Sequence, residues 1–227
     1  IPFVSKATGL PLAKIAAKVI MGHSLQDLGY TREIIPRNVS VKEVLLPFDH
    51  LPGADPLLSP EMRSTGEVMG IDNDFAHAFF KAQTSAENEL PLTGTVFISI
   101  RKADRKDLDP IARKMQGAGL HLICTQGTAK YLHEKGIQTK TIKKVSEGEP
   151  NIVNLIQENK IQLIINTPTS KQSRSDGYHI RRAAVDYKIP YITTIQAAQT
   201  AANAIIAIKL EKINIKSLQE YHRENKE

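Results

Sequence analysis

The feature that most constrains the fold is a regular alternation of short apolar runs and helical patterns after residue 93. The predicted strands are Thr95–Ile100, His121–Thr125, Gln138–Ile142, Gln162–Asn166 and Tyr191–Thr194. Helices are predicted near 106–117, 128–135, 150–159, 177–188, 196–210 and 216–224. Strands and helices that alternate at this spacing form crossover units. The pattern therefore predicts an α/β fold with a five-stranded parallel sheet and helices on both faces.

The first 90 residues show a different, α+β pattern. Apolar residues at helical spacing predict a helix after Pro11, and Ser24 is expected to cap a second helix that ends near Gly29. The remaining expected elements are strands at 40–47 and 65–71 and a helix from Asn73 or Asp74 to about Ala86. Two strands would leave unpaired edges. We therefore expect this region to be an incomplete unit and the chain to be a fragment of a longer protein.

Charge divides the chain at the same place. Residues 1–90 hold 8 Lys and Arg against 11 Asp and Glu, whereas residues 91–227 hold 22 against 13. We expect two domains, 1–90 and 91–227, with the boundary in ENELPLTG at 87–94. The basic second domain indicates an anionic partner. Because no long Lys/Arg run interleaved with aromatic residues occurs, a phosphorylated small molecule is preferred over nucleic acid.

The sequence gives little support for a catalytic thiol, a membrane span, a metal site or catalytic carboxylates. The single cysteine, Cys124, indicates a reducing cytoplasm and is either a buried apolar side chain, the favoured reading, or a catalytic thiol. No apolar run is long enough to span a bilayer, so no membrane partner is expected. The histidines form no close pair and no metal site is predicted. Asp104 and Asp176 are either catalytic carboxylates or, preferably, helix caps or ion-pair partners.

Polar residues gather where the predicted strands end. Ligands bind beyond the carboxyl ends of strands in open parallel sheets. Thr125-Gln-Gly-Thr128 leads from a strand directly into a helix, whose free amides and two threonine hydroxyls suit a phosphate. Arg105 and Lys144 follow neighbouring strands and would neutralise it. The alternative is that Thr128 only caps its helix.

Three segments resemble a known family: PFVSKATGLPLAKIAAKVIMG (2–22), SVKEVLLPF (40–48) and DPLLSPEMRSTGEVMG (55–70). They are similar to the end of the second synthetase half of carbamoyl phosphate synthetase large subunits, an ATP-grasp domain. From about residue 93 the chain resembles that family's regulatory domain, which has the methylglyoxal synthase-like fold. The resemblance implies the carboxyl-terminal part of an ATP-dependent C–N ligase, which makes carbamoyl phosphate for pyrimidine and arginine synthesis.

The family's substrates are bicarbonate, two ATP and ammonia, which a glutaminase small subunit supplies from glutamine. The resemblance implies ATP and Mg or Mn as cofactors of the full subunit. The metal-binding residues of the family precede the stretch where this chain begins. We therefore expect no cofactor in the chain itself and no activity in isolation.

The resemblance also implies two effector sites. In the family's regulatory domain a nucleotide monophosphate such as UMP or IMP lies at the strand ends. The matching residues are Ser99, Arg105, Thr125, Thr128, Lys144 and Asn166, and Thr169 lies beside a further family position that is Pro168 here. An ornithine site at the domain junction matches Glu43, the backbone of Leu46, Tyr191 and Thr193. Without the resemblance, Glu43 would be taken as an outward-facing strand charge.

Three functions remain in view. The first is regulatory nucleotide binding. The second is a methylglyoxal synthase-like lyase acting on dihydroxyacetone phosphate, which would need a carboxylate base that the loop after Asn166 lacks. The third is an assembly module, because the family's large subunits associate through regions that include this domain. We expect the first.

Overall fold

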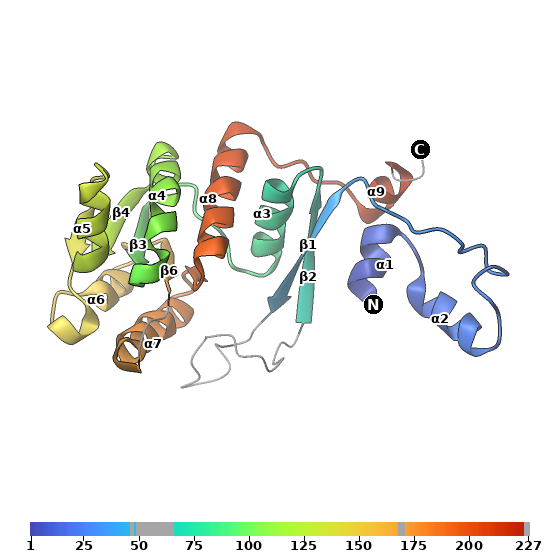
Figure 1. Cartoon of the computed structure of the whole chain (residues 1–227), viewed down its shortest axis with the longest axis horizontal. Helices are drawn as coiled ribbons and strands as arrows, with labels where there is room; N and C mark the ends of the chain where they lie inside the picture. Colours follow the sequence, from blue (N-terminus) through green and yellow to red (C-terminus); the bar gives the residue numbers. More distant parts are fainter. Residues whose placement is uncertain (46–47, 49–65, 168–170, 225–227) are drawn as a thin grey trace.

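The computed structural model describes residues 1–45, 48, 66–167 and 171–224, and for residues 171–175 only the backbone. The molecule is elongated (Figure 1). A large sheet with its helices occupies one end, a two-stranded ribbon lies in the middle, and α1, α2 and α9 lie at the other end.

The large sheet has the predicted architecture. Its five strands are β3 (Thr95–Ser99), β4 (His121–Thr125), β5 (Lys140–Ile142), β6 (Leu163–Asn166) and β7 (Tyr191–Ile192). They lie in the order β5-β4-β3-β6-β7, and every neighbouring pair is parallel. The predicted α/β class with a five-stranded parallel sheet is confirmed.

Alternating side chains of each strand enter two separate cores. Val96 and Ile98 of β3 pack with α4 (Leu108–Gly117), α5 (Gln126–Glu134) and α8 (Ile195–Leu210). Phe97, between them, packs instead with α6 (Ile152–Gln157) and α7 (Lys171–Asp186). Because successive strand residues point to opposite faces, this alternation places helices on both sides of the sheet (Figure 1).

The strand order fixes where a ligand can bind. From the central β3 the chain moves outward to β4 and β5, and then returns past β3 to form β6 and β7. The connections after β3 and β6 therefore leave in opposite directions, and open α/β folds bind ligands in the crevice expected at such a switch point, at the carboxyl ends of the two strands. Ser99 and Asn166, which end β3 and β6, are paired in register there.

The first part of the chain contains the predicted strand pair. β1 (Val39–Leu45) and β2 (Gly66–Asp72) are antiparallel and are covered by α3 (Phe75–Ser85). Helices α1 (Pro2–Thr8) and α2 (Leu12–Ile20) precede them. The predicted helix from Ser24 to Gly29 is wrong, because only turns form there. Ser24 and Asp27 exchange side-chain to backbone hydrogen bonds, but Gly29, at φ 76°, ends the helical conformation after a single turn.

The two parts are joined by packing as well as by the chain. Helix α3 contacts β1 and β2 on one side and α8 on the other. Phe80 of α3 belongs to the same apolar core as Val96 and Ile98. The domain boundary near residue 90 stays a prediction, because α3 packs against elements of both parts of the chain.

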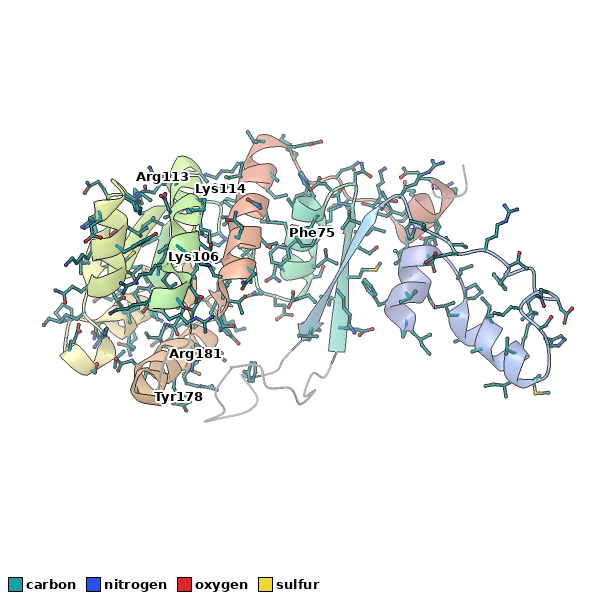
Figure 2. All side chains as sticks on the ribbon, viewed as in Figure 1. Phe75, Lys106, Arg113, Lys114, Tyr178 and Arg181 are labelled. Atoms are coloured by element: carbon teal, nitrogen blue, oxygen red, sulfur yellow. The ribbon has the colours of Figure 1, made fainter. Side chains whose placement is uncertain are left out.

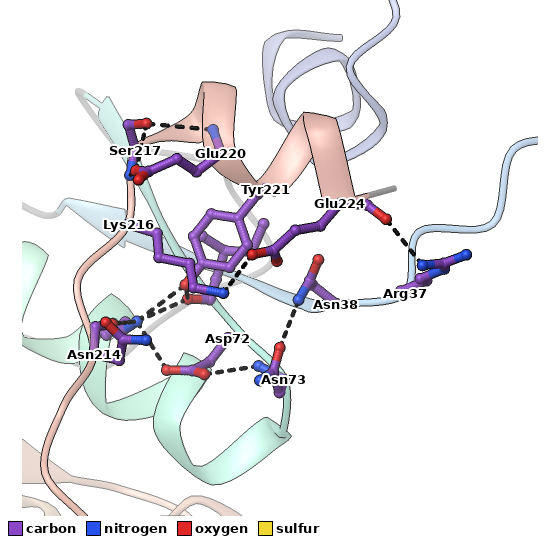
Figure 3. A network of polar contacts seen from close by, with 12 residues as sticks. Arg37, Asn38, Asp72, Asn73, Asn214, Lys216, Ser217, Glu220, Tyr221 and Glu224 are labelled. Atoms are coloured by element: carbon purple, nitrogen blue, oxygen red, sulfur yellow. Dashed lines mark hydrogen bonds and ion pairs between the residues drawn. The ribbon is translucent and has the colours of Figure 1, made fainter. Parts of the chain in front are cut away.

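The segment after α8 returns to the first part of the chain. Helix α9 (Leu218–Glu224) lies beside α1 (Figure 1), and His222 Nε2 lies 2.6 Å from the backbone oxygen of Lys6. The buried Tyr221 donates a hydrogen bond to the backbone oxygen of Ile71 at 3.0 Å. Figure 3 shows Asn214, Lys216 and Tyr221, from residues 211–224, close to Asp72 of β2. We call residues 211–224 the return segment.

A lysine lies at the centre of this contact. Lys81 Nζ is 2.8 Å from Asp72 Oδ2, in an ion pair whose side chains are 15% and 14% exposed. The same ammonium group donates to Tyr221 Oη at 3.2 Å and to the backbone oxygen of Asn214. All three donors of an otherwise costly, largely buried charge are thereby used. Among the described residues, no helix is long and apolar enough to cross a membrane.

Candidate anion-binding site

Four of the predicted effector residues meet at the crevice between β3 and β6. Thr125 Oγ1 lies 3.3 Å from Ser99 Oγ and 3.4 Å from Thr128 Oγ1. The backbone N–H of Ile100 donates to Thr128 Oγ1 at 3.4 Å. Asn166 Nδ2 lies 3.5 Å from the backbone oxygen of Ser99. Three hydroxyls and one amide from β3, β4, α5 and β6 thus form one polar cluster.

The start of α5 is available for an anion. The helix begins at Gln126, and its N-cap residue, Thr125, makes no side-chain capping hydrogen bond. The hydroxyl of Thr128 is directed to Thr125 and Ile100, so the alternative in which Thr128 caps the helix does not describe the structure. The amides of the first turn are free to bind an oxyanion, which the helix dipole favours.

Arg105 brings a positive charge to the same turn. It lies in a short 3-10 helix, η2 (Lys102–Asp107), that follows β3. A Cβ atom added to Gly127 would be 2.8 Å from Arg105 Nη2, so the guanidinium lies directly against the turn between Thr125 and Thr128. Within the described part of the chain, Arg105 Nε is buried without a hydrogen-bond partner. A buried, unsatisfied donor beside free helix amides is the arrangement expected of an anion site without its anion.

Two residues predicted to bind the nucleotide remain, Lys144 and Thr169, and the described part of the chain shows no hydrogen bond between Lys144 and this polar cluster. Lys144 follows β5 at the same end of the sheet and is exposed at the start of a second 3-10 helix, η3 (Val145–Glu147). The loop that carries Lys144 is anchored to α7, because Ser146 Oγ donates to Asp176 Oδ2 at 2.7 Å. Thr169 lies outside the described residues.

One residue of the cluster was missed by the sequence analysis. Arg181 of α7 is only 1% exposed, and its Nη1 donates to Asn166 Oδ1 at 3.2 Å. Figure 2 labels it on α7. Gly177, one helical turn earlier, makes room for it, since an added Cβ there would lie 2.7 Å from Arg181 Nη1. Residues four apart share one face of a helix, so a glycine there permits the arginine to lie back along the helix surface but does not by itself predict it.

The residues predicted for a second effector come from both parts of the chain, and no contact between Glu43 and Tyr191 or Thr193 is recorded among the described residues. Glu43 of β1 accepts a hydrogen bond from Gln83 Nε2 at 2.7 Å. Burial raises the pKa of the Glu43 carboxyl, and hydrogen bonds from Val44 and Gln83 only partly offset it. Tyr191 begins β7, Thr193 directly follows it, and Leu46 lies outside the described residues. Phe48, the described residue after β1, contacts α7, because Arg182 Nη1 donates to its backbone oxygen at 3.0 Å.

The other candidate reactive groups, Cys124, Asp104 and Asp176, are buried or engaged with neighbouring side chains. Cys124 is fully buried, and burial raises the pKa of its thiol to about 12, so the thiolate that nucleophilic chemistry needs does not form at neutral pH. Asp104 pairs with Arg101 at 2.7 Å, and Asp176 accepts hydrogen bonds from Ser146. No group of three His, Cys, Asp or Glu suited to a metal occurs among the residues that the structure describes.

The comparisons with known proteins agree with this fold. Residues 107–193, which include most of the second sheet, match the family of MGS-like domains. The chain is 63% identical over 225 residues to the carbamoyl phosphate synthase large chain of Methanosarcina mazei, an alignment that covers 99% of this chain. It is 61% identical over 228 residues, and over its whole length, to the protein of the same name from Methanosarcina barkeri.

The chain belongs to the carbamoyl phosphate synthase large-chain family. A relative from Methanoregula boonei with the same name is 57% identical over 223 residues, or 98% of this chain. The chain spans 21% of the M. mazei and M. boonei relatives and 57% of the M. barkeri protein. The family resemblance expected from the three sequence segments is therefore confirmed.

Proposed function

We propose that this chain binds a regulatory nucleotide monophosphate at the crevice between β3 and β6. The observation that carries the proposal is the buried, unpartnered Nε of Arg105 beside the uncapped first turn of α5. A phosphate at that turn would accept hydrogen bonds from the helix amides, from the hydroxyls of Thr125 and Thr128, and from the guanidinium. Asn166 and Ser99 lie next to it, at the position that the sugar or base of a nucleotide would occupy.

The position of the site supports a ligand of that size. The crevice lies at the topological switch point of the sheet, where open α/β folds bind nucleotides. Lys144, on the next loop, would add a second cation at the phosphate, and Thr169 would add a hydroxyl. Among the described residues, the two candidate carboxylates have other partners, because Asp104 pairs with Arg101 and Asp176 accepts from Ser146. Binding is therefore proposed, and lyase chemistry on dihydroxyacetone phosphate is not.

Isothermal titration with UMP, IMP and inorganic phosphate tests the site. Arg105→Met should weaken binding of the anion about tenfold to a hundredfold, as expected for loss of charged hydrogen bonds. Lys130→Met is the matched control, because Lys130 is an exposed cation on α5. Its affinity should equal that of the unchanged protein. Failure of UMP and IMP to bind at millimolar concentration, or an equal effect of both variants, would contradict the proposal.

In the longer protein the nucleotide would act as an allosteric effector. Its differential affinity for two arrangements of the first and second parts would shift the synthetase that the relatives' name describes. We assign residues 1–90 to the end of the carbamoyl-phosphate-forming ATP-grasp domain and 91–227 to the regulatory domain. Glu43, the backbone of Leu46, Tyr191 and Thr193 would bind an ornithine-type effector between them.

The whole protein would be a cytoplasmic, glutamine-hydrolysing ligase in pyrimidine and arginine synthesis. ATP with Mg or Mn and a glutaminase small subunit would belong to that complete enzyme, and the present chain alone would be inactive. Self-association through the second part would be visible as a concentration-dependent mass in light scattering.

A further inference from the structure

The fully buried guanidinium of Arg181 lies beneath the proposed nucleotide site. Among the described residues it is the largest side chain that is less than 2% exposed, and its helical neighbours Ile180 and Ala184 belong to the apolar core on the α6 and α7 side of the sheet. A guanidinium stays protonated inside a protein, so burying one is costly unless its donors are used. Apolar packing alone therefore does not explain why a guanidinium is buried at this position.

The geometry connects this charge to one ligand-facing side chain. Arg181 Nη1 donates to Asn166 Oδ1 at 3.2 Å. Gly177 makes room for the contact, because an added Cβ would lie 2.7 Å from Arg181 Nη1 and 3.2 Å from Asn166 Oδ1. Asn166 itself is 7% exposed and ends β6 at the switch point.

This contact removes an ambiguity in the asparagine. The oxygen and nitrogen of an asparagine amide are similar in size, and their assignment depends on their partners. A guanidinium has only donors, so it can face only the oxygen. The Asn166 Nδ2 group must then point away from Arg181. One of its hydrogens is directed to the backbone oxygen of Ser99, at a long 3.5 Å. Among the residues that the structure describes, no acceptor is recorded for the other, which we assign to a ligand.

We propose that Arg181 is a positioning residue that fixes the amide of Asn166, so that the site presents a hydrogen-bond donor there and selects a ligand with an acceptor oxygen. This inference rests on the proposed function for the nature of the ligand, a nucleotide monophosphate. The acceptor is a phosphate, sugar or base-carbonyl oxygen of that nucleotide. A ligand that offered only a donor at this point would face the donor N–H groups of Asn166 and could not form a hydrogen bond with them.

The positioning itself is tested without a ligand. The side-chain amide signals of Asn166 are identified in the ¹⁵N spectrum of the labelled chain by their loss in Asn166→Leu. Arg181→Lys should shift them, because lysine keeps the charge but not the planar donor pair. Gly177→Ala should shift them as well, because its Cβ would lie against both the guanidinium, at 2.7 Å, and Asn166 Oδ1, at 3.2 Å, so Arg181→Lys is the variant that isolates the guanidinium. Arg113→Lys, on the exposed face of α4 (Figure 2), should leave them in place.

The consequence for binding is tested by UMP titration. Asn166→Leu and Gly177→Ala should each weaken UMP about threefold to tenfold, the range for one neutral hydrogen bond. The double variant should be no weaker than the poorer single variant, since Arg181 acts through Asn166. Unmoved Asn166 signals in both Arg181→Lys and Gly177→Ala would overturn the inference. Additive losses of affinity would also overturn it. If UMP, IMP and phosphate all fail to bind the unchanged chain, the proposed function falls, and the spectrum still decides the positioning.

Discussion

Gly70 lies on β2 where α3 passes over the strand. A Cβ atom at this position would overlap the backbone oxygen of Ala78 and lie 2.5 Å from the backbone nitrogen of Ala82. Both atoms belong to the backbone of α3, so neither can turn away as a side chain would. The final glycine of the segment RSTGEVMG is therefore required by the close approach of a helix to a strand.

We expect Gly70→Ala to destabilise the chain by about 1–3 kcal/mol or more, because the helix must move away from the sheet to admit the methyl group. Gly117→Ala is the matched control. Gly117 ends α4 with nothing near its Cβ position, so alanine there should be neutral or stabilise by about 0.5–1 kcal/mol. Urea unfolding followed by circular dichroism measures both. Equal stability of the two variants would contradict the packing argument.

Residues of the candidate site differ in how well the sequence predicts them. Thr125 and Thr128 flank a turn between a strand and a helix, so local spacing alone places their hydroxyls together. Ser99 and Asn166 follow because parallel strands end at one edge. Arg181 could not be placed in this way. Its helical neighbours predict a surface or core position equally well, and its partner Asn166 lies 15 residues away on another element.

At the scale of the element, α3 begins with a charged cap. Asp74 Oδ1 accepts hydrogen bonds from the backbone N–H groups of Ala76 and His77 at 2.9 and 3.1 Å, and Asp74 Oδ2 lies 2.6 Å from His77 Nδ1. Burial pushes the pKa of Asp74 upward, but the hydrogen bonds from His77 and Ala76 outweigh it and leave the pKa lowered. The ionised carboxylate is therefore preferred in the folded chain.

Asp74→Ala should cost about 1 kcal/mol of stability at pH 7 through loss of the cap. Because the folded pKa of Asp74 is lowered, its charge stabilises the fold above the unfolded pKa of about 3.9 and ceases to do so as the pH falls through the folded value. The difference between the unchanged chain and Asp74→Asn should therefore shrink below about pH 4. Thr194→Ala, which removes the uncharged cap of α8, should show the same cost at both pH values. Urea unfolding at pH 7 and pH 3 compares them.

Most elements could be predicted because their signals are local. The five strands of the second sheet fall within one or two residues of the apolar runs that predict them. Helix α7 begins at Lys171 rather than near 177, since its first turns, KQSRSD, are polar and carry no apolar periodicity. At 24–29 a helix is predicted and turns are found, because the capping pair Ser24 and Asp27 can start a helix but cannot extend it past Gly29.

At the scale of the whole molecule, the return segment ties the last residues to the first part. Tyr221 is 2% exposed, and its hydroxyl lies between the backbone oxygen of Ile71 and Lys81 Nζ. The sequence predicted the helix near 216–224 but not its location, because its partners precede it by about 140 residues. Long-range contacts of this kind leave no periodic signal.

Tyr221→Phe should cost about 1 kcal/mol by removing the hydrogen bonds to Ile71 and Lys81, and Tyr221→Ala about 3–5 kcal/mol by also emptying the site. The exposed Tyr187 gives the matched control Tyr187→Phe, which should change little. Hydrogen exchange should show earlier loss of protection in β2 of both Tyr221 variants than in β3. Uniform loss across both sheets would mean that the return segment does not act locally.

The return segment also sets an order of events during synthesis. The ribosome completes β1, β2 and α3 more than a hundred residues before Tyr221 is made. Until then Asp72 and Lys81 have each other but neither the phenol nor the Asn214 carbonyl. The nascent first part therefore stays partly uncovered until residues 211–224 are synthesised. The second sheet, which comes between them in the sequence, is made in the meantime.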